Sequence, residues 1–325
     1  MSNSHSNEPN KKVPLMLAPM AGVTDSAFRI IVREVSGYNG LMFSEMVSST
    51  GLHYKSQKTF EMLQFTEAEL PISVQLFGSN PDYVAEAAQY VSQLKNLSAI
   101  DVNLGCPAPK IVKNGEGSAL MKNPELTAEI LRVLRHSTTL PVSVKMRLGF
   151  DSEHINVIEI AKIAEEAGVD SITVHGRTRD QFYAGTADWT AIAKVKQTVN
   201  IPVVANGDVR DFDSLDEIIK VTNCDGVMIG RAAMGNPWIF KRLNHYLNTG
   251  EQLPAPTVED KFKILRRHLD LLLEFKGEYV GIREMRKHAA WYTKGLSGGS
   301  ELRDRFNNAQ TKSDFLSIID NAALA

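Results

Sequence analysis

Residues 141–147, Pro-Val-Ser-Val-Lys-Met-Arg, form a short β-branched run of a kind that recurs along this chain. Turn residues flank each run, and this pattern predicts β-strands. Seven similar runs occupy residues 13–19, 41–46, 72–77, 99–104, 171–175, 201–206 and 226–229. The chain therefore carries eight predicted strands at an even spacing.

Helical patterns lie between these strands. Apolar side chains spaced three and four apart predict helices at residues 82–94, 125–135, 155–167, 189–195 and 214–221. Near-continuous apolar strands joined by helices predict an α/β protein with a parallel sheet, and eight βα units of about thirty residues close naturally into a TIM (β/α)8 barrel. An open doubly wound sheet is the alternative, and the lack of a G-x-G-x-x-G motif after the first strand argues against it.

The chain is longer than one barrel. Its 325 residues exceed the about 250 of a typical TIM barrel. Leu253-Pro-Ala-Pro256 is typical of a linker, and only helical patterns follow it. We therefore expect a disordered extension at residues 1–12, a catalytic barrel domain at residues 13–250 and a small C-terminal all-helical domain at residues 251–325.

Composition excludes several classes of protein. Hydrophobic residues make up 43% and charged residues 23% of the chain, which is typical of a globular protein. No apolar run approaches the roughly 20 residues that span a bilayer, and the polar N-terminus has no signal-like core, so we expect a cytoplasmic protein without a membrane partner. Cys106 and Cys224 have no zinc-ligand or Cys-x-x-Cys spacing, so neither a disulfide framework nor a metal site is predicted.

Positive charge is concentrated near the C-terminus. The formal net charge of −2 argues against a protein that coats nucleic acid, but between Lys261 and Lys294 nine Lys and Arg residues oppose four Asp and Glu. Helical projection separates a basic face from an apolar face in this segment. The basic face contains Arg283, Arg286, Lys287, Ala290 and Lys294, and the apolar face contains Ile282, Met285, Ala289, Tyr292 and Leu296. A solvated face is the ordinary explanation, but the segregation of charge favours a polyanionic partner.

Polar residues and glycines gather where the predicted strands end. TIM-barrel enzymes place their active sites at the carboxyl ends of the strands, so these residues should meet at one mouth. In chain order they are Pro19, Met20, Ala21, Glu45, Gln75, Asn103, Cys106, Lys145, His175, Asn206, Gly207, Asp208, Gly230 and Arg231. Every predicted strand contributes to this candidate site.

A phosphate site is predicted after the last two strands. Barrels commonly bind phosphate there through backbone N–H groups and a helix N-terminus. Gly207 and Gly230 would let the backbone approach the ligand, and Arg231 would supply a cation. Turn chemistry is the plain alternative.

Lys145 lies inside an apolar strand, where an uncompensated ammonium carries a substantial desolvation cost. It therefore needs an anionic partner. A flavin whose reduced ring is negatively charged near N1 and O2 is one such partner. A carboxylate on a neighbouring strand, such as Glu45, is the other.

Cys106 follows the fourth strand in a loop rich in glycine and lysine. With an unperturbed pKa near about 8.5, it is mostly a neutral thiol at about pH 7 and can donate a proton as a general acid. Cys224 is interpreted as a buried packing residue. His175 stands beside Arg177 and Arg179, which favours contacts to cofactor phosphate or RNA backbone over a structural role.

Six motifs resemble the dihydrouridine synthase family and occur in that family's order, within a match that runs from Leu17 to about Phe315. They are Leu17-Ala-Pro-Met-Ala-Gly-Val-Thr-Asp25, Asn103-Leu-Gly-Cys-Pro-Ala108, Lys145-Met-Arg-Leu-Gly149, His175-Gly-Arg-Thr-Arg179, Asn206-Gly-Asp208 and Met228-Ile-Gly-Arg-Ala-Ala233. The resemblance implies tRNA as substrate, NADPH or NADH as reductant, and bound FMN. The implied FMN ligands are Pro19, Met20, Ala21, Gln75, Lys145, His175, Asn206, Gly207, Asp208, Gly230 and Arg231.

Cys106 matches the family's proton donor. In the implied mechanism, flavin N5 delivers hydride to C6 of a uracil in the D-loop of tRNA while Cys106 protonates C5. The base must leave its stack to reach the flavin, so Asn103 is expected at the uracil edge and the helical domain at the folded RNA. The expected RNA contacts are Arg177, Arg179, Arg283, Arg286 and Lys287.

The subfamily and the substrate leave alternatives open. Residues 230–240 and 286–292 most resemble the B-type bacterial enzymes, whereas residues 107–110, 141–149 and 187–191 resemble the C-type. The uridine position that is reduced therefore stays open, and we expect a monomer. One alternative is a dihydrouridine synthase that acts on ribosomal RNA. A second is a small-molecule FMN enzyme of the dihydroorotate-dehydrogenase kind, which does not explain the basic tail. A third is a non-catalytic RNA-binding barrel, which would bind tRNA without flavin.

Overall fold

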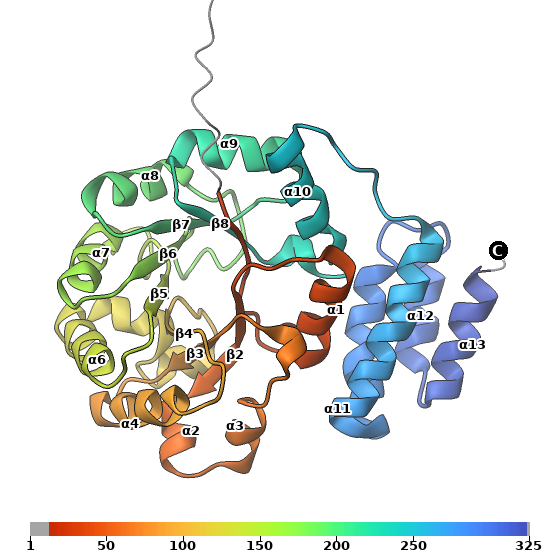
Figure 1. Ribbon diagram of the computed structural model, residues 1–325, viewed down its shortest axis with the longest axis horizontal. Helices are drawn as coiled ribbons and strands as arrows, with labels where there is room; N and C mark the ends of the chain where they lie inside the picture. The colour runs from red at the N-terminus through yellow and green to blue at the C-terminus, as the bar shows by residue number, and fades with distance from the viewer. Residues whose placement is uncertain (1–12, 324–325) are drawn as a thin grey trace, which may run out of the picture.

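The computed structural model describes residues 13–323. Eight parallel strands pair in sequence order and close into a barrel (Figure 1). The strands are β1 (Leu15–Leu17), β2 (Met42–Ser48), β3 (Ile72–Phe77), β4 (Ala99–Leu104), β5 (Val142–Met146), β6 (Ser171–His175), β7 (Val203–Asn206) and β8 (Gly226–Ile229). The predicted TIM barrel is confirmed.

Helices surround the barrel and continue beyond it (Figure 1). The longer barrel helices are α1 (Ser26–Ser36), α4 (Pro81–Ser92), α6 (Pro124–His136), α7 (Val157–Glu166), α8 (Trp189–Thr198), α9 (Phe212–Thr222) and α10 (Trp238–Thr249). Shorter elements are α2 (Ser49–His53), α3 (Gln57–Glu61), α5 (Pro109–Lys113), η1 (Glu67–Glu69), η2 (Gly117–Lys122) and η3 (Arg231–Ala233). A C-terminal helical region holds α11 (Val258–Tyr292), α12 (Gly299–Asn308) and α13 (Lys312–Ala323). Within residues 13–323, no helix is both long and apolar enough to cross a membrane.

Prolines shorten two of the predicted strands. Residues 13–19 were expected to form the first strand, but β1 keeps only Leu15–Leu17 between Pro14 and Pro19. Residues 201–206 were expected to form the seventh, but β7 begins after Pro202. Proline has no N–H to donate to the ladder, so Pro14 and Pro202 only accept, from Val227 N at 2.9 Å and Ile172 N at 3.0 Å, and the regular strands begin after them.

The interior of the barrel is polar towards its carboxyl end. Successive residues of a strand point to opposite faces. On β4, Ile100 and Val102 join the apolar core, whereas Asp101 and Asn103 make hydrogen bonds to side chains of neighbouring strands. The register of β4 and β5 pairs Asn103 with Lys145, so both are carried to the same level of the barrel.

Helix α11 reverses direction at Gly277, whose backbone angles (φ 70°, ψ 168°) are not helical. Glycine has no Cβ and adopts such angles without steric cost. The two halves of α11 then run close together, because a Cβ on Gly281 would lie 3.0 Å from the carbonyl oxygen of Leu272. The expected helical region is present, but α11 ends at Tyr292, so the basic face predicted as far as Lys294 stops short of that residue.

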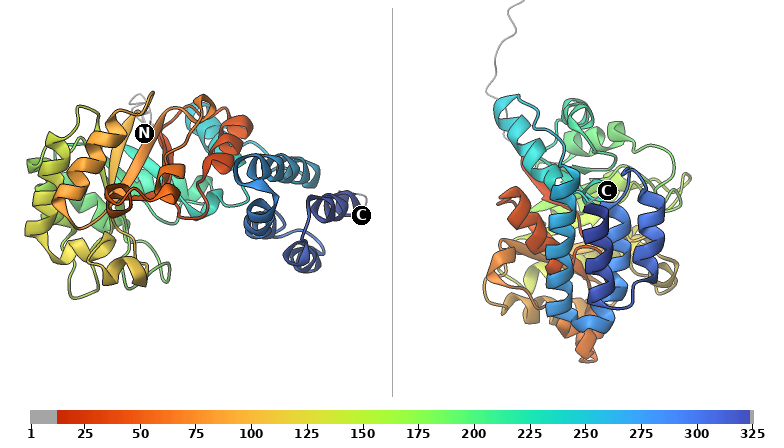
Figure 2. Two further views of the ribbon diagram at one scale, coloured as in Figure 1. Left: turned by 90° about the horizontal axis from the view of Figure 1, so that it is seen from below. Right: turned by 90° about the vertical axis from the view of Figure 1, so that its right-hand side faces the viewer.

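The C-terminal helices pack against one side of the barrel, on α1 (Figure 2). Ala27, Ile30 and Ile31 of α1 share an apolar cluster with side chains of α11, α12 and α13. Two ion pairs cross this junction, Lys276 with Asp25 and Arg267 with Glu34. The helical region is therefore fixed to the helix that directly follows β1.

Candidate active site at the barrel mouth

Cys106 is held at the mouth by Asn103, which lies near the end of β4. The side-chain oxygen of Asn103 accepts the backbone N–H groups of Gly105, at 3.0 Å, and of Cys106, at 2.8 Å. The carbonyl of Cys106 accepts a hydrogen bond from the Ser118 hydroxyl at 2.8 Å. The thiol is buried, and burial raises the pKa of Cys106 above its ordinary value. It is therefore a neutral S–H at neutral pH, as a proton donor must be.

A chain of hydrogen bonds runs from the barrel interior to this loop. Gln75 Nε2 donates to Asp101 Oδ2 at 2.6 Å, and Asn103 Nδ2 donates to Gln75 Oε1 at 2.8 Å. Ser143 donates to the other oxygen of Asp101. Because Asp101 accepts on both oxygens, Gln75 must present its carbonyl to Asn103, and the carbonyl of Asn103 must then face the Cys106 loop.

Lys145 lies in the interior without a partner among the carboxylates. Within residues 13–323 no carboxylate comes into ion-pairing distance of its ammonium, and burial, helped by Arg147, lowers the pKa of Lys145 to about 8. Glu45, the alternative partner considered above, instead accepts the N–H of Gly22. An anionic ligand at the mouth would raise the pKa of Lys145 again.

Four cations surround His175. Burial lowers the pKa of His175 well below its ordinary value, and Lys145, Arg147, Arg177 and Arg231 lower it further. The imidazole is therefore neutral, and the charged groups that act on it most are cations. A site of this kind attracts an anionic group such as a phosphate.

Asp208 organises the cations on the β7 and β8 side. Its carboxylate accepts two hydrogen bonds from Arg177, at 2.9 and 2.7 Å, and one from Arg231 at 3.0 Å. Gly207, with φ of 125°, precedes it; a Cβ there would lie 2.8 Å from the Ala187 side chain and 3.1 Å from the His175 ring. Only glycine lets the chain pass this close to His175.

Gly230 is different, because a Cβ at this position would have room. A Cβ on Gly230 would meet Ala18 and the Met20 sulfur at 3.6 Å, an ordinary contact distance, and φ of Gly230 is −109°. The missing side chain therefore leaves room in front of the backbone beside Arg231. A glycine, a cation and a neutral imidazole at the carboxyl ends of β6 to β8 suit a phosphate-bearing cofactor.

Three functional candidates were missed by the sequence analysis. Arg147 donates to Gly105 O, Thr178 O and Phe182 O, and so ties the Cys106 loop to the loop after β6. Tyr183 is half exposed, and the guanidinium carbon of Arg231 lies 4.7 Å from the centroid of the Tyr183 ring. Asp101 is the third. Arg147 and Asp101 could have been predicted from the sequence, because each is a charged residue inside or at the end of an apolar strand. No sequence pattern indicated Tyr183.

The match to a family model decides the identity. The model for dihydrouridine synthase matches residues 16–325. This chain belongs to the dihydrouridine synthase family. It is accordingly an enzyme, a flavin-dependent oxidoreductase.

Relatives extend over most of this dihydrouridine synthase. A "tRNA-dihydrouridine synthase B" of Pseudomonas aeruginosa is 44% identical over 296 residues, covering 91% of this chain and 88% of the relative. A "Probable tRNA-dihydrouridine synthase" of Rickettsia conorii is 42% identical over 294 residues, covering 90% of this chain and 88% of the relative. The predicted resemblance to B-type enzymes is confirmed. A 2-naphthoyl-CoA reductase shares the fold, with a TM-score of 0.55 and 12% identity over 71% of this chain and 50% of its own.

The residues at the mouth of the synthase fit a flavin. Lys145 is a partly buried cation with no carboxylate of residues 13–323 in ion-pairing distance, the His175 side holds an excess of positive charge, and Gly230 leaves space. Of the other predicted ligands, Pro19, Met20 and Ala21 form the turn after β1, where Val23 N donates to Met20 O at 2.9 Å. Asn206 closes β7 and donates to Met228 O at 2.7 Å. In residues 13–323 there is no cluster of three or more His, Cys, Asp or Glu that could hold a metal ion.

The arginines predicted to contact RNA differ in what they offer. Arg177 is 1% exposed, and its guanidinium donates hydrogen bonds to Asp208, Ala184 O and Gly185 O. It is therefore not accessible to RNA. Arg179 lies between the rings of Phe150 and Phe182 and pairs with Asp180. In both cases the loop after β6 folds back and uses the arginine internally, which the motif alone did not indicate.

In the C-terminal region the predicted RNA contacts also divide. Arg286 donates to Ala309 O at 2.7 Å and is half-buried between helices. Arg283 is exposed, and Lys287 reaches the mouth, where a Cβ on Gly22 would lie 3.3 Å from its ammonium. Arg283 and Lys287 are therefore the accessible cations of this set.

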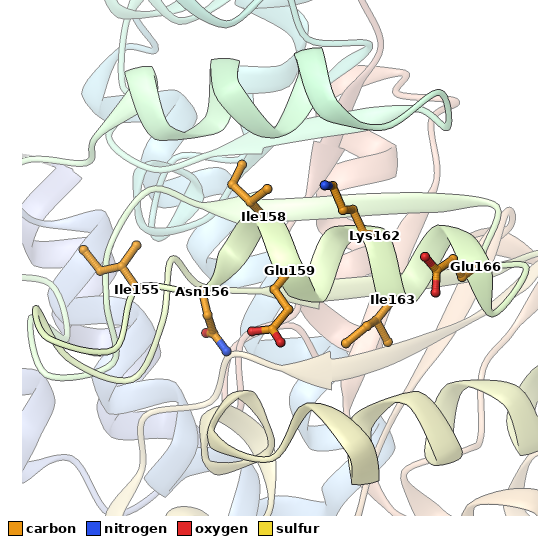
Figure 3. Close-up of a pocket in the computed structure, with 7 residues that line it drawn as sticks. All are labelled: Ile155, Asn156, Ile158, Glu159, Lys162, Ile163 and Glu166. Carbon is orange, nitrogen blue, oxygen red and sulfur yellow. The ribbon is translucent and has the colours of Figure 1, made fainter.

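One hollow of the described surface lies away from this chemistry. It holds about 560 Å³ along the outer face of α7, lined by Ile155, Asn156, Ile158, Glu159, Lys162, Ile163 and Glu166 (Figure 3). None of the mouth residues borders it. We assign the active site to the mouth, because that is where the buried cations, the thiol and the family motifs meet.

Proposed function

We propose that this protein is an FMN-dependent tRNA-dihydrouridine synthase that uses NADPH or NADH to reduce uridine, in the D-loop of tRNA. The observation that carries the proposal is that the Cys106 thiol and the Lys145 ammonium belong to neighbouring βα units and influence each other's pKa at one mouth. The names of the relatives support tRNA as the RNA. The protein would act in the cytoplasm, as a monomer.

The roles of the residues follow from their surroundings. FMN would be held by Lys145 at its ring and by His175, Gly207, Gly230 and Arg231 at its phosphate, with the remaining predicted ligands along the first, third and seventh strands. Bound FMN supplies the hydride that reduces C6 of the uracil. Cys106 holds the proton for C5, and its raised pKa keeps that proton in place until it is transferred.

Asn103 would do two things at once. Its carbonyl oxygen already holds the backbone of the Cys106 loop, and its amide donates to Gln75. Contact with the uracil edge, as proposed from the motif, would use a second hydrogen of the same amide, which now faces the Met46 sulfur at 3.1 Å. The base and the proton donor would then be positioned by one side chain.

The RNA would cover the mouth from the side of the helical region. We propose residues 13–250 as the catalytic barrel domain and residues 251–325 as the tRNA-binding domain, with Arg283 and Lys287 as phosphate contacts. The target base is flipped out of its stack, because a stacked base cannot reach the bottom of a barrel mouth.

Purified protein and its gene test the proposal together. The protein should be yellow, NADPH or NADH should bleach it, and it should form dihydrouridine in unmodified tRNA. Mapping dihydrouridine in cells that lack the gene, and in cells that carry it again, identifies the RNA and the position. Loss from ribosomal RNA alone would replace tRNA as substrate, and reduction of free pyrimidines with no effect on RNA would favour a small-molecule dehydrogenase.

A further inference from the structure

We infer that the turn of α11 is a stacking platform for one unpaired nucleotide of the RNA substrate, with the base lying on the ring of Tyr279. The inference rests on the proposed function, because it assumes that the substrate is a folded RNA. It concerns residues 275–280, called here the hairpin tip. The tip surrounds Gly277, where the two halves of α11 meet.

The hairpin tip exposes apolar side chains where a folded protein usually has none. Tyr279 is 72% exposed, Val280 42% and Phe275 40%. Three exposed apolar side chains thus fall within six positions of the chain, and a gathering of this kind marks a binding site more often than a single exposed residue does. Tyr279 is the most exposed of the large hydrophobic side chains in residues 13–323.

The Tyr279 ring is held in one orientation. Arg283, one turn later, donates to Tyr279 O at 2.8 Å and places its guanidinium carbon 3.4 Å from the ring centroid. This cation–π contact covers one face of the ring, and the high exposure of Tyr279 shows that the remainder is open. A ring fixed in this way loses little conformational entropy when a base stacks on it.

The hairpin tip is attached to the barrel mouth. Lys276 donates to Asp25, and Asp25 also accepts the N–H of Phe28 as the N-cap of α1. Asp25 ends the turn that follows β1 and forms one side of the mouth. Further along α11, Lys287 reaches Gly22 of the same turn. A nucleotide on Tyr279 would therefore lie beside the RNA segment that enters the mouth.

The charges around the hairpin tip suit a polyanion. Within the described part of the chain, Arg283 and Lys287 form no ion pair, so their charge is free for phosphates. Of the acids near the tip in sequence, Glu284 pairs with Lys276 and Glu278 accepts the backbone N–H of Lys312 at 2.8 Å, while Glu274 is exposed. An aromatic ring flanked by unpaired cations matches single-stranded nucleic acid, whose bases stack and whose phosphates pair with basic side chains.

Substitutions at Tyr279 test whether the ring contributes to RNA affinity by stacking on a base. In the full-length flavin-loaded protein, Tyr279→Ala should raise Kd and KM for an unmodified tRNA transcript by about 5- to 100-fold, since stacking of one base accounts for that range. The turnover number at saturating tRNA should change far less. Tyr279→Phe, which keeps the ring, should restore affinity to nearly that of the wild type. Tyr90→Ala is the matched control, because Tyr90 is also exposed, at 42%, but lies on α4.

Salt dependence distinguishes the ring from its cation. Arg283→Gln should lower the slope of log Kd against log salt by about one, because it removes one phosphate contact, whereas Tyr279→Ala should keep the slope of the wild type. The inference is overturned if Tyr279→Ala binds tRNA normally, if Tyr279→Phe is as weak as Tyr279→Ala, or if Tyr279→Ala changes the oligomeric state. If the wild-type protein forms no dihydrouridine in RNA, the proposed function is overturned instead. The ratios of Kd between variants test only the stacking of a base on Tyr279 and do not measure that activity.

Discussion

Cys106 owes its position to neighbours that are themselves fixed by hydrogen bonds. Its backbone N–H is held by Asn103, its carbonyl by Ser118, and the adjoining Gly105 carbonyl by Arg147. The motif predicted the thiol and its place after the fourth strand. The motif did not indicate the chain of bonds through Gln75 to Asp101, because that chain depends on the register between β3, β4 and β5.

Cys106→Ala should lower the rate of dihydrouridine formation by about 100-fold or more and leave FMN bound, since a positioned general acid contributes roughly that factor. The visible spectrum gives the flavin content, and turnover on unmodified tRNA gives the rate. Because burial raises the pKa of Cys106, the wild-type rate should fall only at alkaline pH above the ordinary thiol range. Turnover equal to the wild type in the alanine variant would remove Cys106 from the reaction.

Asp101 should make the stability of the flavin-free protein depend on pH. Burial raises the pKa of Asp101 from 3.8 to about 7, so the folded state binds the proton more tightly than the unfolded state. The stability that this group adds is complete below about pH 4 and is lost as the pH rises towards 7. The free energy of unfolding of wild type minus Asp101→Asn should therefore fall across that interval, with a slope approaching about 1.4 kcal/mol per pH unit. A difference that is independent of pH would show that Asp101 does not titrate there.

At the scale of elements, periodicity predicted the strands well and the loops poorly. β3, β4, β6 and β8 have the predicted bounds, because their apolar runs end at turn residues. The loop after β6 was expected to offer Arg177 to the ligand or to RNA, but it folds back so that Arg177 supports Asp208 instead. Such a reversal depends on contacts between loops of different βα units, and no local pattern encodes it.

Gly207 should be required at the end of β7. Gly207→Ala places a Cβ 2.8 Å from the Ala187 side chain at φ of 125°, so it should destabilise the protein by about 2–3 kcal/mol and weaken FMN binding. Gly250→Ala is the control: Gly250 has φ of 76° but nothing within 4 Å of the new Cβ, so it should cost only about 1–2 kcal/mol and leave FMN affinity unchanged. Thermal unfolding and flavin titration measure the two effects. Equal losses in both variants would mean that the crowding at His175 is unimportant.

At the scale of the whole molecule, the sequence predicted a helical region with a basic face but not its shape. The projection treated residues 282–296 as one helix, whereas α11 ends at Tyr292 and its Arg286 turns towards Ala309. The reversal at Gly277 and the docking on α1 follow from tertiary packing between distant segments. Those contacts decide which cations remain accessible.

The junction between the two parts should depend on one of its ion pairs. Burial raises the pKa of Asp25, but Lys276, together with His268 and the N–H of Phe28, outweighs this effect and holds the pKa below its ordinary value. Lys276→Gln leaves Asp25 almost fully buried without its cation and should lower stability by about 1–3 kcal/mol. Arg267→Gln removes the exposed pair with Glu34 and should cost at most about 1 kcal/mol. If denaturant unfolding shows equal losses, the junction is held by its apolar cluster alone.

Helix α1 connects two binding events that would otherwise be independent. Its first turn is continuous with the segment of Pro19, Met20 and Ala21 proposed to line the flavin, and its outer side carries the region proposed to bind RNA. A movement of that region on binding would therefore shift the segment proposed to contact the cofactor. Thermodynamic linkage makes such a coupling reciprocal: by whatever factor tRNA changes the affinity for FMN, FMN changes the affinity for tRNA by the same factor.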